Sequence, residues 1–287
     1  MSITGIDSCI SGATENIMFY KTYSGTLIYG HHSSWNMNGI PGAAPISTAG
    51  LTGESLYTNS GGLIPDYTVP FLEQPGLTTY LGNLTNCSAV MTAQNHCGLI
   101  MCDRLWQNSG IVVTTITAQT INSVTWPPRD LNGSTDGVGV HIGLEVYTPT
   151  TNGSNISNAF ITYTNSDGVP SRTAYFRFNP ATALPANMNQ SFFCLATLHR
   201  GDKGVRSIQS ITLGTSLVSG SISLVALRII DIAAGPAAIY AHNQPPNCLS
   251  SGPRIKLHSG TVPFFLSDPA TASATATILG QLHYINA

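Results

Sequence analysis

The sequence predicts an all-β protein built from antiparallel strands. Past residue 97, short runs rich in Val, Ile, Thr, Tyr and Phe recur, and Gly, Asn, Asp or Pro bounds each run. Almost no segment has the apolar spacing of an amphipathic helix. About eight or nine short strands with frequent turns favour an antiparallel sandwich or barrel.

The expected strands follow one another from residue 98 onward. Within Val138–Thr148 the even positions from 138 to 146 are all apolar while the odd ones are mixed, which indicates a strand with one buried face. The dipeptide Asp167-Gly168 predicts a hairpin, because Gly readily adopts the positive φ of a tight turn. The expected strands are Gly98–Asp103, Ile111–Thr117, Val138–Thr148, Ala159–Thr164, Arg172–Phe178, Gln190–Leu198, Val205–Leu213, Ser221–Ile230 and Ala276–Tyr284.

Residues 1–97 form a separate region in this prediction, an extended and irregular N-terminal arm in front of a β-sandwich domain at 98–287. The arm is punctuated by Pro and Gly, and only Ala13–Tyr20 has modest helical character. Because the arm has too little charge for a solvated disordered tail, we expect it to lie on its own sandwich or on a neighbouring subunit. A long loop at about 235–269 precedes the last strand.

Charge is scarce along the whole chain. There are 11 Lys and Arg and 13 Asp and Glu, which make up 8% of the residues, against about 25% in an ordinary soluble domain. No basic stripe is present that could neutralise phosphates, so nucleic acid is not an expected partner. The first residues lack a signal-peptide pattern, and the most apolar stretch, Leu224–Tyr240, is interrupted by charged residues, Gly and Pro. Neither classical secretion nor a membrane span is therefore expected.

The common sequence motifs of catalytic and metal-binding sites are missing or incomplete. No nucleophile elbow, zinc-protease motif or phosphate-binding loop occurs, and the few carboxylates offer little for a glycosidase pair. Asp130–Gly137 has a spacing similar to a calcium loop, but Gly143 stands where a bidentate Glu is needed, so a polar turn is the better interpretation. His96-Cys97 and Cys102 lack the second Cys/His pair of a zinc site. We expect no enzyme activity, no cofactor and no metal.

Several short motifs occur in a fixed order between about residues 99 and 230, and again near Gln281–Tyr284. They are Asp103–Gly110, Pro128–Asp130, Asn132-Gly133, Thr135–Gly137, Glu145, Tyr163–Gly168 and Gly201–Ser210. In this order they resemble a group of virion structural proteins of tailed bacteriophages. The resemblance implies a non-enzymatic particle protein and agrees with a β-sandwich that assembles as a trimer.

Our leading hypothesis on this basis is a capsid decoration (cement) protein. It would be a jelly-roll-like sandwich in a homotrimer, assembled in the host cytoplasm, located in the virion, and bound to the major capsid protein or other virion subunits. Low charge agrees, because large and permanent interfaces favour uncharged surfaces. The alternatives are a neck, collar or tail-fibre component, or a carbohydrate-binding adsorption module in which exposed Trp35, Trp106 or Trp126 stacks on sugars.

Six cysteines occur, and none of their spacings is C-x-x-C. Buried thiols are the first interpretation for a chain made in a reducing cytoplasm, and disulfides formed later are the second. A virion released into an oxidising medium could oxidise thiols near subunit boundaries. Cys9 in the arm and Cys248 in the long loop are the candidates for an interchain disulfide, because irregular segments can reach a neighbour. The candidates for intrachain disulfides are Cys87, Cys97, Cys102 and Cys194.

Overall fold

Strands make up all of the regular structure that the computed structural model describes, and every pairing between them is antiparallel. The predicted all-β, antiparallel class is confirmed. In the described part of the chain no helix has the length and apolarity to cross a membrane. The described residues are 13–23, 32–35, 49–57, 77–86, 97–151, 155–177, 183–185, 187–233, 255–269 and 276–286.

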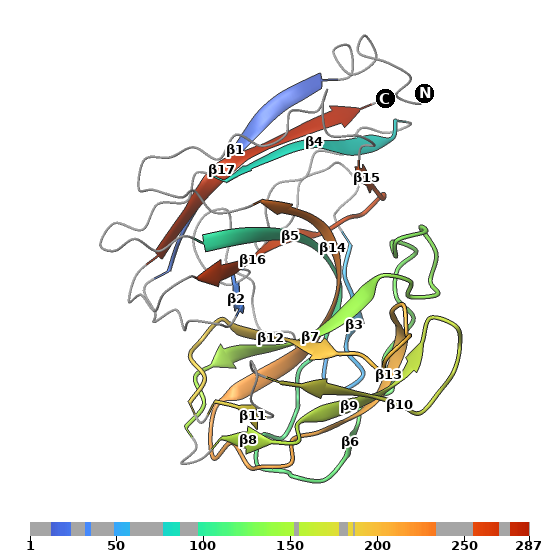
Figure 1. Cartoon of the computed structure of the whole chain (residues 1–287), viewed down its shortest axis with the longest axis vertical. Coiled ribbons are helices and arrows are strands. Elements are labelled where there is room, and N and C mark those ends of the chain that lie inside the picture. The colour runs from blue at the N-terminus through green and yellow to red at the C-terminus, as the bar shows by residue number, and fades with distance from the viewer. Residues whose placement is uncertain are drawn as a thin grey trace.

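Six strands close into a barrel in the middle of the molecule (Figure 1). Around the ring they are β2 (His32–Ser34), β16 (Pro263–Pro269), β5 (Cys97–Gln107), β14 (Ser221–Ala233), β7 (Val140–Thr148) and β12 (Phe192–Thr197). The short β2 completes the ring because it pairs with both β16 and β12. The pairings thus define a closed barrel in place of the two facing sheets of the expected jelly-roll-like sandwich.

Apolar side chains from four of these strands fill the barrel. Residues that face each other across two strands share a face of the sheet, so Phe193 of β12 and Glu145 of β7 both point inward. The Phe193 ring lies over Gly143 of β7, where any Cβ atom would overlap it. The apolar filling consists of Ile100, Cys102, Phe193, Val225, Leu227, Phe264 and Leu266.

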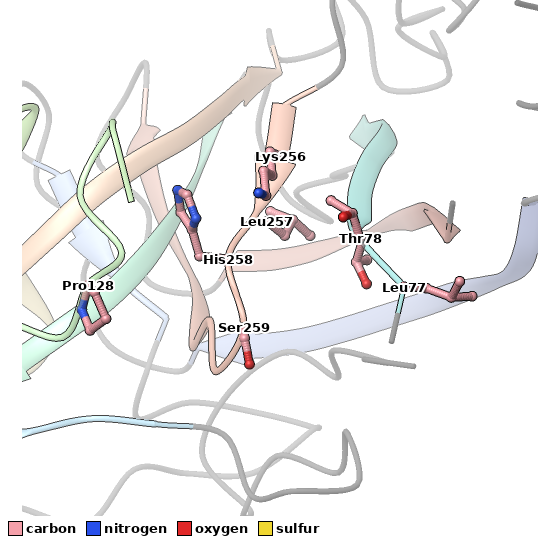
Figure 2. A pocket seen from close by; sticks show the side chains of 8 residues that line it. Leu77, Thr78, Pro128, Lys256, Leu257, His258 and Ser259 are labelled. Carbon is pink, nitrogen blue, oxygen red and sulfur yellow. The ribbon is translucent and has the colours of Figure 1, made fainter. Parts of the chain in front are cut away.

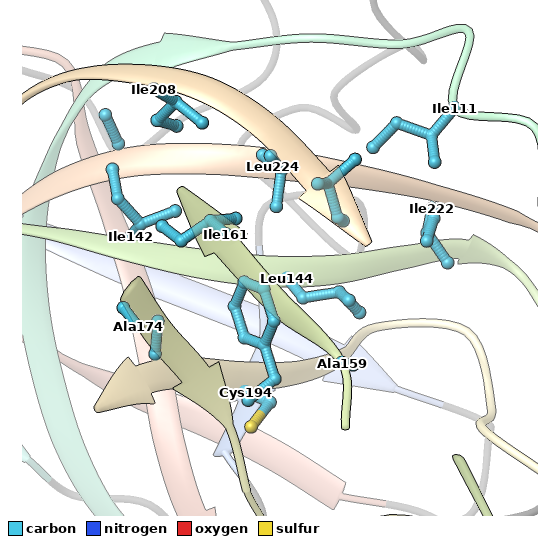
Figure 3. Packing of buried hydrophobic residues seen from close by; sticks show 14 of the residues in the cluster. Ile111, Ile142, Leu144, Ala159, Ile161, Ala174, Cys194, Ile208, Ile222 and Leu224 are labelled. Carbon is cyan, nitrogen blue, oxygen red and sulfur yellow. The ribbon is translucent and has the colours of Figure 1, made fainter. Parts of the chain in front are cut away.

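Beyond β12 the sheet continues and folds over the outer face of β7 and β14. The continuing strands are β10 (Arg172–Phe176), β9 (Phe160–Asn165), β13 (Val205–Thr212) and β6 (Gln119–Thr120). A large hydrophobic cluster occupies the space between, where Ile142, Leu144 and Leu224 lie among Ile161 and Ile208 (Figure 3). Two further pairings are those of β3 (Glu54–Ser55) with β5 and of β8 (Ile156–Ser157) with β11 (Ala183–Leu184).

A separate four-stranded sheet covers the other side of the barrel. Its order is β1 (Ala13–Tyr23), β17 (Ala276–Asn286), β4 (Thr79–Asn86) and β15 (Ile255–Leu257). Phe19 of β1 meets Phe265 of β16 with 4.4 Å between the ring centroids, and Leu282 of β17 belongs to the same buried cluster as Met101 of β5. The molecule therefore has three parts from top to bottom in Figure 1: this sheet, the barrel, and the folded-over strands.

The N-terminal part of the chain departs from expectation. The predicted helix at Ala13–Tyr20 is wrong, because this segment lies in β1, where Met18 is 70% exposed and the adjacent Phe19 is buried, the alternation of a strand. The described parts of residues 1–97 supply β1, β2, β3 and β4, and all of them pair within the same chain. The long loop expected at 235–269 contains β15 and β16, so its described portion is mostly strand; residues 234–254 lie outside the described residues.

Eight of the nine expected strands are present with shifted ends, and the Asp167-Gly168 hairpin joins β9 to β10 as predicted. The strand expected at Ile111–Thr117 is wrong. There the side chain of Gln119 takes the place of a neighbouring strand: its Oε1 accepts from the Val112 N–H at 2.8 Å and its Nε2 donates to the Val112 carbonyl at 3.0 Å. The expectation of one buried face for β7 is also wrong, because its second face lines the barrel.

Candidate functional site

A buried ion pair lies inside the barrel. Nη2 of Arg104 on β5 donates to Oε2 of Glu145 at 2.6 Å and to the hydroxyl of Tyr147 at 2.9 Å, and its Nε donates to Gln107 at 2.9 Å. Both charged side chains are at most 1% exposed. Burial alone would lower the pKa of Arg104, but the contacts with Glu145 and Tyr147 outweigh it and raise the pKa. The Arg104 guanidinium is thus held in its charged form.

A second buried ionic group lies one residue earlier on β5, at Asp103. Its carboxylate accepts two hydrogen bonds from Arg129, to Oδ2 at 3.0 Å and to Oδ1 at 3.1 Å, and Oδ1 also accepts from the Val262 N–H at 2.9 Å. Arg228 of β14 approaches the same carboxylate, with Nη2 at 3.9 Å from Oδ2. Two guanidinium groups therefore share one carboxylate.

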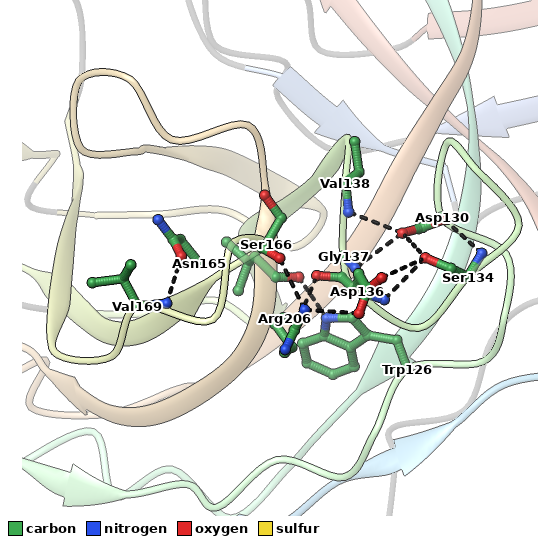
Figure 4. Close-up of polar contacts among 11 residues, drawn as sticks. Trp126, Asp130, Ser134, Asp136, Gly137, Val138, Asn165, Ser166, Val169 and Arg206 are labelled. Carbon is green, nitrogen blue, oxygen red and sulfur yellow. Dashed lines mark hydrogen bonds and ion pairs between the residues drawn. The ribbon is translucent and has the colours of Figure 1, made fainter.

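The loop that resembles a calcium loop is held by Asp130 (Figure 4). The Asp130 carboxylate accepts from the backbone N–H groups of Asn132, Ser134, Gly137 and Val138, at 2.7 to 3.0 Å, and from the Ser134 hydroxyl at 2.8 Å. Burial raises the pKa of Asp130, but these hydrogen bonds outweigh it and lower the pKa. The carboxylate shapes a polar turn, as predicted. Among the described residues no three His, Cys, Asp or Glu side chains gather so as to hold a metal.

Two further contacts join the ends of strands below the barrel. Arg206 pairs with Asp136 at 2.7 Å and also donates to the Ser166 carbonyl at 3.0 Å (Figure 4). The Tyr163 hydroxyl donates to Asp202 at 2.5 Å. Burial and this contact raise the pKa of Tyr163 to about 12.

These contacts gather the motifs that carry the resemblance to virion proteins. Residues from separate motifs meet in pairs: Asp103 with Arg129, Arg104 with Glu145, Asp136 with Arg206, and Tyr163 with Asp202. Most of these partners are buried and bonded to one another. The arrangement can hold loops and strands in place.

Two of the candidate cysteines are free thiols, Cys102 inside the barrel and Cys194 in the large cluster between β7 and β9. The intrachain disulfide expected for them is therefore not supported. The two thiols do not pair because they lie in separate apolar clusters. Burial raises the pKa of Cys194 to about 12. Cys97 belongs to β5. The remaining candidates, Cys9, Cys87 and Cys248, lie outside the described residues.

The three tryptophans do not form a sugar-binding platform. Trp35, Trp106 and Trp126 are each at most 1% exposed. Their indole N–H groups donate inside the protein, for instance from Trp35 to the Ser267 hydroxyl at 2.7 Å and from Trp126 to the Val205 carbonyl at 2.7 Å. Their rings pack in the hydrophobic cores of the fold.

A pocket of about 330 Å³ lies between the four-stranded sheet and the segment before Asp130 (Figure 2). Its polar wall includes Lys256, His258, Ser259 and Thr78, and its described lining residues include no acid. The sequence interpretation missed this site because it assigned 235–269 to a loop. The alternation of Ile255, Lys256, Leu257 and His258 is the period-two signal that could have revealed a strand with a polar edge.

Comparisons of the chain with family models, with curated proteins and with solved structures gave no match. The proposal for its function consequently depends on its motifs and on how its charged side chains are distributed.

Proposed function

We propose that the chain is a non-enzymatic structural protein of a tailed-phage virion, and that it decorates and stabilises the capsid. The burial of its few charges carries this proposal. At least six of the 24 charged side chains lie in the interior, so at most 18 remain for the outer surface. They are Asp103, Arg104, Arg129, Asp130, Glu145 and Arg228. A surface with so little charge suits large, nearly permanent interfaces.

Exposed apolar side chains support the same proposal. Large apolar residues are more than half exposed on several elements of the described chain, including Met18 on β1, Ile232 on β14, and Val218 and Leu131 in loops. Scattered apolar residues are common on any protein surface. Combined with scarce charge, however, they give several faces on which neighbouring subunits could pack.

The finer parts of the proposal concern assembly. We take the barrel with its two covering layers as a variant of the jelly-roll-like sandwich, associated as a homotrimer that contacts the major capsid protein. The motifs support this proposal, since their residues hold the strands and loops of one rigid unit together. Such a unit, with most strand edges paired, is suited to repeated assembly.

Electron microscopy of assembled particles tests the proposal. Density for the three-part fold on the outer surface of the head is expected, and particles that lack the chain should release their DNA at a lower temperature. Density in the neck or tail would instead support the alternative that the chain is a neck, collar or tail-fibre component. Absence of the chain from purified particles would reject a structural role.

A glycan array tests the adsorption alternative, which the buried tryptophans do not support. The purified protein is expected to bind no glycan on the array. Reproducible binding of one glycan class would instead favour an adsorption module, with a surface other than the tryptophans.

A further inference from the structure

Cationic and hydroxyl groups converge in the pocket beside β4 and β15. Lys256 and Ser259 are exposed, and Thr78 and His258 are half-buried, so all four can be reached from solvent. Figure 2 shows their side chains around the opening, from β15, the turn after it and the segment leading into β4. Groups of this kind donate hydrogen bonds to anions.

Two buried arginines lie behind the wall of this pocket with hydrogen-bonding capacity left over. Nη1 of Arg129 and both Nε and Nη2 of Arg228 have no hydrogen-bond partner, although these side chains are only 1% and 4% exposed. Asp103 already accepts from Arg129 and Val262, and Asp130 is occupied by its own loop. A buried charged group without a full set of partners is costly, so these donor atoms favour a further hydrogen-bond acceptor nearby.

Arg129 lies beside two of the segments that line the pocket. Pro128 lines the pocket and is followed directly by Arg129. His258 and Ser259 line it too and lead into Gly260, at which a Cβ atom would lie 3.5 Å from Nη1 of Arg129. Burial and the nearby charges of Arg228 and Lys256 lower the pKa of His258, and together they outweigh the opposing effect of Asp103 and Asp130. Both cationic groups therefore lie close enough to His258 to act on a ligand held beside it.

We propose that this pocket binds an oxyanion, a phosphate or carboxylate group. Lys256, His258 and the hydroxyl groups of Ser259 and Thr78 contact the anion, and the buried guanidinium groups stabilise it from behind the wall. Charge-assisted hydrogen bonds of this kind are about twice as strong as neutral ones. The inference goes beyond the proposed virion role and does not depend on it.

Titration of the purified full-length protein with inorganic phosphate and, separately, with acetate tests the inference. The readouts are the His258 ring C–H resonance by NMR and the thermal unfolding midpoint, with sodium chloride at matched ionic strength as the reference. Either oxyanion should move the resonance saturably and raise the midpoint, whereas chloride should not. The anion that saturates at the lower concentration identifies the source, a phosphate group or a carboxylate.

Lys256→Met removes the charge and keeps most of the apolar stem, and it should weaken anion binding about tenfold or more. Because Lys256 is exposed, the variant should unfold at the wild-type midpoint when no anion is present. Lys203→Met, at an exposed lysine outside the pocket lining, is the matched control and should bind as the wild type does. Ser259→Ala provides a second variant if Lys256→Met folds poorly.

Two results would overturn the inference: no response of the His258 resonance to either oxyanion, or equal affinity in the wild type and in Lys256→Met or Ser259→Ala. Neither result bears on where the chain lies in a particle. Failure of this site and failure of the virion proposal can therefore be told apart.

Discussion

The inside of the barrel and the large hydrophobic cluster beside it share strand β7 but differ in chemistry. The even positions of β7, such as Ile142 and Leu144, enter the apolar cluster. The odd positions face the barrel and include Gly143, Glu145 and Tyr147, which are small, charged and polar. The two faces of one strand can therefore belong to different interiors, and only the apolar face is visible as a pattern in the sequence.

The barrel can contain a charged pair because its strands supply partners for both charged groups, although Nη1 of Arg104 and Oε1 of Glu145 have no hydrogen-bond partner. Arg104 meets Glu145 and Tyr147 from β7, and its guanidinium also lies 5.2 Å from the centroid of the Phe264 ring on β16. The neighbouring cluster consists of hydrophobic residues without an ion pair and depends mainly on close packing. The comparison predicts that the barrel is sensitive to loss of a partner and the cluster to loss of volume.

The largest effect is expected from Arg104→Met, which leaves Glu145 buried and unpaired. The free energy of unfolding, measured by urea denaturation, should fall by about 3–5 kcal/mol. The double variant Arg104→Met/Glu145→Leu should recover most of this loss, because no charge then remains in the barrel. Arg206→Met is the control: its pair with Asp136 is exposed, so the cost should be at most about 1 kcal/mol. Equal costs for the two single variants would contradict the burial of the Arg104–Glu145 pair.

Truncation in the apolar cluster should come next. Leu144→Ala removes a fully buried side chain and should cost about 2–5 kcal/mol, the usual range for a cavity in a packed core. Val218→Ala, at a residue 65% exposed, should change the stability by less than about 0.5 kcal/mol. Similar midpoints for these two variants in the same denaturation assay would show that the cluster is not closely packed.

Gly143→Ala probes the boundary between the two interiors. The added methyl group would overlap the Phe193 ring, and overpacking of this kind costs about 1–3 kcal/mol. Phe193→Leu removes the ring and leaves space for this methyl group. Gly143→Ala should therefore lower the free energy of unfolding clearly less in the Phe193→Leu background than in the wild type. A double-mutant cycle of unfolding free energies measures this difference. Additive costs would show that the ring does not occupy this space.

The smallest effect is expected from pH. His141 follows Val140 on β7 and pairs with Leu227 of β14 on the barrel face, and burial lowers its pKa. Below about pH 6.5 the unfolded chain binds a proton that the folded chain does not, so stability should decline as the pH falls from 7.5 toward 5.5. Each pKa unit of difference is worth about 1.4 kcal/mol. In His141→Gln the free energy of unfolding, measured by urea denaturation at pH 7.5 and pH 5.5, should decline less between the two pH values than in the wild type. An unchanged decline would show that other groups cause the pH dependence.

Sequence patterns predicted the strands and turns correctly where these depend on interactions between residues close in the chain. Strand β9, the Asp167-Gly168 turn and strand β10 were predicted together, because alternation and turn chemistry act over a few residues. They failed at Ala13–Tyr20, where pairing with β17 decides for a strand, and at Ile111–Thr117, where Gln119 bonds to the backbone. The first contact joins segments at opposite ends of the chain, and the second is a bond from a side chain to the backbone that the alternation of apolar residues does not reveal.

The candidate site was less predictable than the fold. The motifs pointed to the residues that form the ionic contacts, but which residue meets which depends on strand register. Lys256 and Thr78 lie far apart in the chain and reach one pocket only because β15 pairs with β4. No spacing rule could have joined them.

The sequence by itself determined the all-β class, most strand positions and a surface with little charge, since these follow from period-two patterns, turn residues and composition. Tertiary structure decided that β2 closes a barrel, that Arg104 finds Glu145, and that Phe193 fills the space at Gly143. The physical reason is that burial and pairing are properties of surfaces brought together from distant segments. The amino-acid sequence defines the chemistry of each residue, but the register in which strands pair decides which other residue it contacts.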